Sequence, residues 1–360
     1  MSYERDNIQR MRGYEWGEQP EGADVVKLNT NENPYPPSPR VQEALAGFDV
    51  ASLRRYPRPT ADPLRDRLAL KHSLARDHVL ITHGGDEGLR LAMTTFVDPG
   101  ATFAMAEPSY SLYPVLAEIQ DARVYTLELE EDWTLPADVA ARINDAGARL
   151  TCLVNPHAPS GTLTLVDRLA DIAQALDGVL LVDEAYVDFV DPELDYDLTR
   201  LVRELTNLLV LRTFSKGYSL AGLRLGYMLG HPALIDPMIS KTRDSYNVDA
   251  ISQALGEAAL RDRAYAEETW ARVREGRQAL RDGLAQLGLP SPDSQTNFLL
   301  VQVPRESPRS ARELYEHLKA RHILVRYFDT PRLDDRLRIS VGTTEQNQRL
   351  IAALQEALHG

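Results

Sequence analysis

Short apolar segments alternate with amphipathic segments over the middle of the chain, from residue 78 to about residue 230. The apolar segments have the length and composition of buried strands, and they are His78–Thr82, Thr102–Ala106, Arg123–Leu129, Leu150–Val154, Val179–Val182, Leu208–Leu211 and Leu225–Leu229. Helical patterns lie between them, for example at Asp86–Phe96, Ala137–Asn144 and Leu165–Leu176. Because nearly continuous apolar strands that alternate with helices are typical of parallel sheets covered on both faces, this region predicts an α/β fold with a mainly parallel sheet of seven strands.

The pattern changes on both sides of this region. A polar arm of about 28 residues precedes it, and a helical pattern without proline runs from about Asp249 to Leu287, long enough to bridge two domains. The tail reads as a small α+β unit: strand Phe298–Val303, helix Ala311–Arg321, strands Ile323–Tyr327 and Leu337–Val341, and a last helix from Thr343 with Gln346 completing a capping box. We therefore predict an N-terminal arm at 1–45 that packs partly on the small domain, a large domain at 46–255, and a small domain at 256–360 that includes the long interdomain helix.

Composition and charge exclude several classes of function. The chain has 360 residues and a formal net charge of −13, which argues against a nucleic-acid partner because phosphate neutralisation needs surplus Lys and Arg. No run of about 20 apolar residues predicts a membrane span, and residues 1–6 lack the apolar core of a signal peptide. The single cysteine, Cys152, lies in an apolar run and is best explained as a buried, inert thiol. These features predict a cytoplasmic protein without a metal site.

Polar residues follow several of the predicted strands, where ligands bind in open α/β sheets. His83-Gly84-Gly85-Asp86-Glu87 comes after the first strand and is either an anion-binding helix start or an ordinary tight turn. Asn155-Pro156-His157-Ala158-Pro159-Ser160-Gly161 comes after the fourth strand, with His157 interpreted as a turn residue. Asp183-Glu184-Ala185-Tyr186 comes after the fifth, where Asp183 either pairs with a cation or bonds to local backbone.

A lysine follows the sixth strand, in the segment Arg212-Thr213-Phe214-Ser215-Lys216, and Arg224 lies eight positions further on. Partial burial would lower the pKa of such a lysine and make its neutral amine available for Schiff-base chemistry. A guanidinium together with hydroxyl groups is well suited to bind phosphate. A lysine alone is weak evidence for a functional site, but its combination with the polar residues at the other strand ends is specific. Pyridoxal phosphate (PLP) needs a phosphate cradle, a partner for the ring oxygen, an anion at the ring nitrogen and an amine at the aldehyde.

Four motifs carry a resemblance that covers nearly the whole chain. These are Leu28-Asn29-Thr30-Asn31-Glu32-Asn33-Pro34-Tyr35, Arg55-Tyr56-Pro57, Thr213-Phe214-Ser215-Lys216 with Gly222-Leu223-Arg224, and Leu337-Arg338-Ile339-Ser340-Val341-Gly342-Thr343. With them the chain resembles the fold type I PLP-dependent aminotransferases, and most closely the histidinol-phosphate aminotransferase family. One motif departs from that family, because its Asn-Pro-Asn-Asn-Pro-Thr-Gly turn is replaced by residues 155–161; since the first Asn is kept, its cofactor contact is expected to survive.

The resemblance implies a role for each matching residue. Lys216 would hold the cofactor as a Schiff base and shuttle a proton, Asp183 would keep the pyridine nitrogen protonated, and Asn155 and Tyr186 would bond to the ring hydroxyl oxygen. Tyr110 would stack on the ring, and the cofactor phosphate would be held by Gly85, Asp86, Thr213, Ser215, Arg224 and, from a neighbouring subunit, Tyr56. The expected substrate contacts are Arg338, Arg326, Tyr14 and Asn33.

The activity implied is transamination between L-histidinol phosphate or imidazole-acetol phosphate and glutamate or 2-oxoglutarate, in histidine biosynthesis. The two arginines suit both the carboxylate and the phosphate substrate, because a guanidinium pairs with either anion. An aromatic or broad-specificity aminotransferase, a PLP-dependent phosphothreonine decarboxylase and a non-catalytic binding protein remain alternatives on the sequence alone. A contact from Tyr56 of a neighbour implies a homodimer with shared sites.

Overall fold

The largest sheet of the protein has seven strands. The computed structural model describes residues 2–19 and 24–359. The sheet order is β2-β8-β7-β6-β5-β3-β4, with bounds β2 (Val79–Thr82), β3 (Thr102–Glu107), β4 (Arg123–Glu128), β5 (Ala148–Val154), β6 (Val179–Asp183), β7 (Leu208–Thr213) and β8 (Gly226–Gly230). β8 runs antiparallel to both of its neighbours and every other pairing is parallel. The prediction of a mainly parallel seven-stranded sheet is confirmed.

Helices cover this sheet and account for the apolar character of its strands. Leu180, Leu181 and Val182 in β6 and Leu208, Leu209 and Val210 in β7 have no exposed surface, as expected for strands buried on both faces. The helices that contact the sheet are α3 (Asp62–Lys71), α4 (Gly84–Phe96), α5 (Leu112–Gln120), α6 (Val139–Asp145) and α8 (Pro232–Pro237), and α7 (Val166–Ala175) packs against α6. α4 begins directly after β2 and packs against β7 and β8, so its first turn lies at the edge of the sheet where β2 ends.

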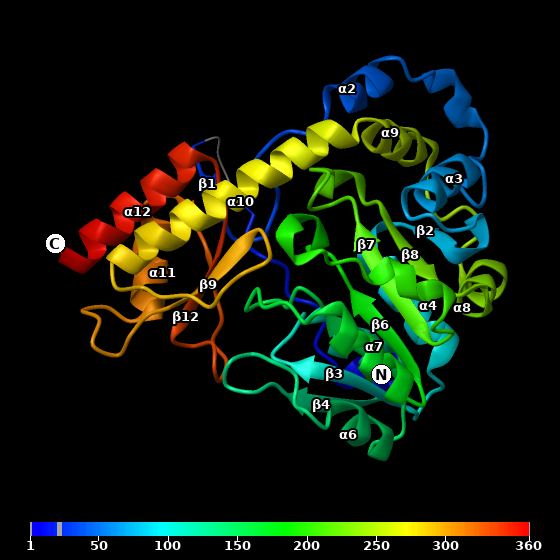
Figure 1. Cartoon of the computed structure of the whole chain (residues 1–360), viewed down its shortest axis with the longest axis horizontal. Helices are drawn as coiled ribbons and strands as arrows, with labels where there is room; N and C mark the ends of the chain where they lie inside the picture. The colour runs from blue at the N-terminus through cyan, green and yellow to red at the C-terminus, as the bar shows by residue number, and fades with distance from the viewer. Residues whose placement is uncertain (1, 20–23, 360) are drawn as a thin grey trace.

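A second, smaller group of strands and helices is formed mainly by the C-terminal third of the chain (Figure 1). Its antiparallel sheet has the order β11-β12-β9, formed by β11 (Arg326–Tyr327), β12 (Arg336–Ser340) and β9 (Phe298–Gln302). A short parallel pair joins β1 (Val26–Lys27) near the chain start to β10 (Ile323–Leu324). The helices here are α11 (Ala311–Ala320) and α12 (Thr344–His359), and α10 (Arg263–Gln286) extends from this group toward the large sheet. The limits 1–45, 46–255 and 256–360 remain a prediction, and residues 1, 20–23 and 360 lie outside the described residues.

The remaining helices are short or flank the large sheet. They are α1 (Asp6–Arg10), α2 (Pro39–Ala46), α9 (Ala250–Arg261), the 3₁₀ turns η1 (Val50–Arg54), η2 (Arg76–His78), η3 (Val187–Phe189), η4 (Pro192–Leu194), η5 (Leu198–Arg203) and η6 (Ala221–Leu223), and the π-helical turn η7 (Met238–Thr242). In the described part of the chain, no helix has both the length and the apolarity that a membrane span requires.

Two predicted elements are interrupted in the structure. The helical pattern from Asp249 to Leu287 is broken at Asp262, whose backbone is not helical (φ −117°, ψ 51°) and whose carboxylate accepts a hydrogen bond from the Ser38 hydroxyl. The predicted strand Ile323–Tyr327 is divided at Val325, because β10 pairs with β1 whereas β11 pairs with β12. The capping box at Thr343 and Gln346 is confirmed, since each residue's backbone N–H donates to the other's side chain.

Candidate active site

A cavity of about 1630 Å³ opens where β2, β6 and β7 end, and it faces β11 and β12 of the smaller sheet. Most of the residues singled out from the sequence line it. These are Tyr14, Gly85, Asp86, Tyr110, Asp183, Tyr186, Thr213, Ser215, Lys216, Arg224, Arg326 and Arg338. The strand ends therefore bring together side chains that the sequence places more than 100 positions apart.

Lys216 is partly buried on the loop that follows β7. Its Nζ donates a hydrogen bond of 2.8 Å to the backbone carbonyl of Thr30, and it lies 5.8 Å from the centre of the Tyr186 ring. Burial lowers the pKa of Lys216 to about 8, against a weaker opposing effect of the Glu32 carboxylate. A larger fraction of this amine is therefore neutral near pH 7 than for an ordinary lysine.

Asp183, the last residue of β6, is a buried carboxyl group with two local hydrogen bonds. The Tyr113 hydroxyl donates to Oδ2 at 2.8 Å, and the backbone N–H of Ala185 donates to Oδ1 at 3.1 Å. Burial nevertheless raises the pKa of Asp183 to about 6, because these bonds compensate only part of the lost hydration. A cation beside Asp183 would therefore be bound favourably. Tyr113 lies on α5 and belongs to no recognisable motif, so its role at this carboxyl group cannot be predicted from the sequence.

The start of α4 and the loop after β7 form an anion cradle. Arg224 Nη1 donates to Ser215 Oγ at 3.2 Å, and Arg224 Nη2 lies 3.5 Å from the Asp86 carboxylate. Gly84 has a positive φ of 75°, and a Cβ atom there would lie 2.6 Å from Arg224 Nη2. The missing side chain lets the guanidinium reach the N-terminal end of the helix, where backbone N–H groups favour a phosphate.

Two arginines face the cavity from the smaller sheet. Arg326 in β11 and Arg338 in β12 are directly opposite each other in the antiparallel register. Arg338 Nη2 donates to the carbonyl of Asn29 at 3.0 Å, whereas its buried Nε has no partner among the described residues. Like charges on facing positions are unfavourable without a counter-ion, and an unpaired buried donor costs about 1–3 kcal/mol. Both features indicate a site for an anionic group.

This geometry agrees with what comparison with known proteins shows. Residues 23–354 match the family described as aminotransferase class I and II. The chain belongs to this family. It is 42% identical over 359 residues to "Histidinol-phosphate aminotransferase 1" of Trichormus variabilis, covering 99% of both chains, and equally similar to the protein of that name from Nostoc sp., covering 98% of that protein. Among solved structures, histidinol-phosphate aminotransferase from Sinorhizobium meliloti in complex with pyridoxal-5′-phosphate has a TM-score of 0.91 and 26% identity, with 99% of this chain and 98% of that one covered.

Three of the expected contacts are not brought into the cavity of this aminotransferase chain. The amide group of Asn155 donates to the Thr164 carbonyl (3.0 Å) and the Tyr196 hydroxyl (2.8 Å), so both of its hydrogens are engaged elsewhere, and Ala158 and Pro159 line the cavity instead. Asn33 donates to the Gly217 carbonyl at 3.3 Å. It therefore supports the backbone next to Lys216 and does not face a substrate. Tyr56 is 81% exposed and stacks on Tyr246, with ring centres 4.5 Å apart.

Other residues in or near the site are held by contacts with neighbouring side chains and backbone groups. Tyr110 packs edge-on against Tyr14 and Tyr113, with ring centres 5.8 and 5.5 Å apart, and forms an aromatic wall of the cavity. Asn31 donates to the Tyr186 hydroxyl at 3.1 Å, which the sequence reasoning missed although Asn31 lies in the motif that pointed to Asn33. His157 is buried between Ser160 Oγ and the Pro108 carbonyl, in agreement with its interpretation as a turn residue.

Proposed function

We propose that this chain is a PLP-dependent aminotransferase that exchanges an amino group between L-histidinol phosphate and 2-oxoglutarate in histidine biosynthesis. One observation carries the proposal: the Lys216 amine and the Asp183 carboxyl group line one cavity, which has an anion cradle at the start of α4 and two arginines on the opposite wall. The names of the relatives and their full-length similarity support the same activity.

The residues present fit the cofactor. The N-terminal end of α4 at Gly85 and Asp86, together with Thr213, Ser215 and Arg224, would bind the phosphate. Asp183 would face the ring nitrogen, where its raised pKa favours a shared proton, and Tyr186 would bond to the ring hydroxyl. Tyr110 would cover one face of the ring. When bound, PLP supplies an aldehyde that accepts the amino group and a ring that withdraws electrons from the substrate Cα.

Lys216 would act twice, first as the amine that attaches the cofactor and then as the group that moves a proton at the substrate Cα. A pKa near 8 suits the second task, because the amine can take up and return a proton near neutral pH. Arg338 and Arg326 would bind the phosphate of histidinol phosphate in one half of the exchange and a carboxylate of glutamate in the other. Tyr14, beside Tyr110, would close this end of the cavity. Asn155 and Asn33 would support the backbone of the site.

We further propose that the enzyme is a homodimer in which Tyr56 enters the partner's site and binds the cofactor phosphate. The exposure of Tyr56 outside its own cavity supports this arrangement. We place the enzyme in the cytoplasm, since a single cysteine, buried at Cys152, fits a protein that needs no disulfide bond.

Comparative kinetics test the substrate assignment. With 2-oxoglutarate as acceptor, we expect kcat/KM for L-histidinol phosphate to exceed that for L-phenylalanine by at least about 100-fold. The doubly charged phosphate can pair with both arginines, whereas the carboxylate of phenylalanine offers a single charge and fewer acceptor oxygens. A ratio near one would favour a broad-specificity aminotransferase. Release of CO₂ from phosphothreonine without any keto acid would instead indicate a decarboxylase.

A further inference from the structure

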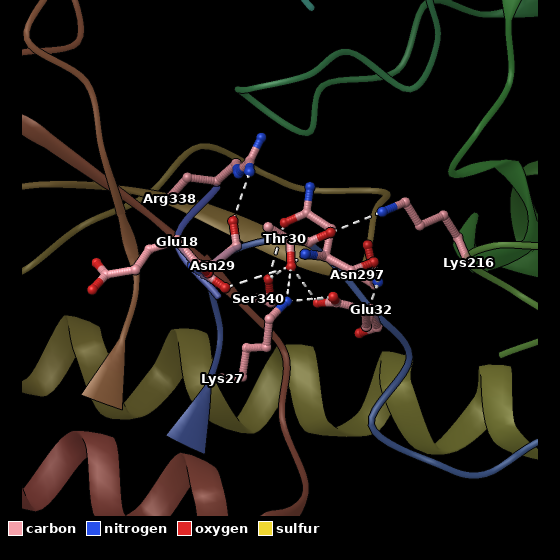
Figure 2. A network of polar contacts seen from close by, with 10 residues as sticks. Glu18, Lys27, Asn29, Thr30, Glu32, Lys216, Asn297, Arg338 and Ser340 are labelled. Atoms are coloured by element: carbon pink, nitrogen blue, oxygen red, sulfur yellow. Dashed lines mark hydrogen bonds and ion pairs between the residues drawn. The ribbon is translucent and has the colours of Figure 1, made fainter. Parts of the chain in front are cut away.

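The segment Asn29-Thr30-Asn31 contacts both the Lys216 side and the Arg338 side of the cavity. Figure 2 shows Asn29 and Thr30 between Arg338 and Lys216. The carbonyl of Asn29 accepts from Arg338, and the next carbonyl, that of Thr30, accepts from Lys216 Nζ at 2.8 Å. The Asn31 side chain contacts Tyr186 on one side and the Ser340 hydroxyl on the other. The amine and one substrate arginine therefore rest on consecutive carbonyl groups, and the position of this segment determines where Lys216 rests when it is not bonded to the cofactor.

The ion pair between Lys27 and Glu32 contacts the Thr30 side chain of this segment. Lys27 Nζ donates to both the Thr30 hydroxyl and the Glu32 carboxylate, and the Thr30 hydroxyl in turn donates to Glu32 Oε2 at 2.5 Å. Each of these three side chains is therefore hydrogen-bonded to the other two. Thr30 and Glu32 also line the cavity. Although burial alone would raise it, the hydrogen bonds from Lys27 and Thr30 hold the pKa of Glu32 below its ordinary value, so the carboxylate is charged at neutral pH.

The charges that face Lys216 come from several elements. Burial is the largest influence and lowers the pKa of Lys216; the Glu32 carboxylate raises it, and Arg338, Lys27 and Arg224 lower it. Glu32 therefore supplies the main opposing charge among groups that otherwise disfavour the ammonium form. Neither Lys27 nor Glu32 belongs to the proposed cofactor or substrate contacts.

We infer that the Lys27–Glu32 ion pair is a positioning device for Lys216: it fixes Thr30, and with it the carbonyl group and the nearby negative charge that receive the free amine. The inference rests on the proposed function, since it assumes that Lys216 binds the cofactor. The two members of the pair act on the free amine with opposite sign, because the carboxylate favours the ammonium form whereas the Lys27 charge disfavours it.

Variants of the pair test this inference in the apoprotein, without any turnover. The rate at which added PLP is captured is followed by visible absorbance from pH 6 to pH 9.5, and borohydride reduction with peptide mapping assigns the adduct to Lys216. Capture needs the neutral amine, so its pH midpoint follows the pKa of Lys216. We expect Glu32→Gln to move the midpoint down and Lys27→Met to move it up, each by roughly half a pH unit or more.

The exposed ion pair between Arg281 and Asp293 provides a matched control, and Asp293→Asn should leave the midpoint unchanged. Urea unfolding of each variant checks that the fold is kept. Midpoints that do not move in Glu32→Gln and Lys27→Met, or that move in the same direction, would show that the pair only stabilises the fold and would overturn the inference. Unaltered protein that captures no PLP at Lys216 would overturn both the inference and the proposed function.

Discussion

At the residue scale, the carboxyl group of Asp183 shows how a binding site reduces the stability of the free protein. The pKa of Asp183 is raised by burial to about 6, above its value of about 3.9 in an unfolded chain. A group with a raised folded-state pKa contributes stability that is fully present below about pH 4 and is lost as the pH rises through about 6. Near pH 8 the apoprotein therefore carries an unfavourable buried charge, which a cationic ring nitrogen would compensate.

The variant Asp183→Asn should remove this unfavourable buried charge and so stabilise the apoprotein. We expect apo Asp183→Asn at pH 8 to gain up to about 3 kcal/mol in free energy of unfolding, and the gain to shrink as the pH falls toward 5. Urea unfolding at fixed protein concentration measures it. The same variant should be stabilised less by added PLP than the unaltered protein is. Equal stability of the two apoproteins at pH 8 would contradict this view of Asp183.

Tyr113 acts on the same carboxyl group through its hydroxyl. A hydrogen bond to a carboxylate favours its charged form, so Tyr113→Phe should raise the pKa of Asp183 further and weaken PLP binding by roughly 10-fold near pH 7. The loss should be greatest at low pH, where more of Asp183 is neutral. Equilibrium titration of apoprotein with PLP at several pH values tests this, with Tyr125→Phe on β4 as the control. Unchanged affinity across the pH range would rule out the coupling.

At the scale of elements, the anion cradle depends on close packing between the start of α4 and β8. Gly226, the first residue of β8, pairs with both Thr82 and Thr213. A Cβ atom at Gly226 would lie 2.8 Å from the carbonyl carbon of Gly84 and 3.0 Å from the Gly85 nitrogen, and backbone atoms cannot move aside as a side chain would. The helix start would be pushed away from Arg224.

We therefore expect Gly226→Ala to lower the free energy of unfolding by about 1–3 kcal/mol and to weaken binding of PLP more than binding of its phosphate-free analogue, pyridoxal. Gly222→Ala is the matched control, because nothing lies within 4 Å of the added methyl group. Equal losses of affinity for PLP and for pyridoxal would show that the cradle is not held by this contact.

The positions of the strands could be predicted from the sequence, because buried strands appear as local apolar runs. Lys216 and Asp183 could also be predicted as site residues, because ligands bind at the carboxyl ends of the strands in open α/β sheets. The break at Asp262 and the change of sheet at Val325 depend on partners far away in the chain, at Ser38 and at β1. Asn155 and Tyr113 show the same limit, since hydrogen bonds with Tyr196 and Asp183 decide where their side chains point.

At the scale of the whole molecule, the proposed homodimer with shared sites predicts complementation between two inactive variants. Lys216→Ala removes the essential amine, and Tyr56→Ala removes the residue that we propose for the partner's site. A hybrid dimer would contain one site with Lys216 from one chain and Tyr56 from the other. Mixing the two variants under conditions that exchange subunits should raise transaminase activity well above the average of the separate proteins. Strictly additive activity after confirmed exchange would place Tyr56 outside the neighbouring site.

The attachment of PLP to Lys216 is the claim on which the proposed activity depends, and borohydride trapping tests it most directly. The chain has only five lysines, at 27, 71, 216, 241 and 319, so a reduced adduct can be assigned without ambiguity by peptide mass. Lys71 is a demanding internal control, because burial also lowers its pKa to about 8 although it does not line the cavity. We predict one phosphopyridoxyl group per chain, on Lys216, and none in Lys216→Ala. An adduct on Lys71 or on no lysine at all would contradict the account.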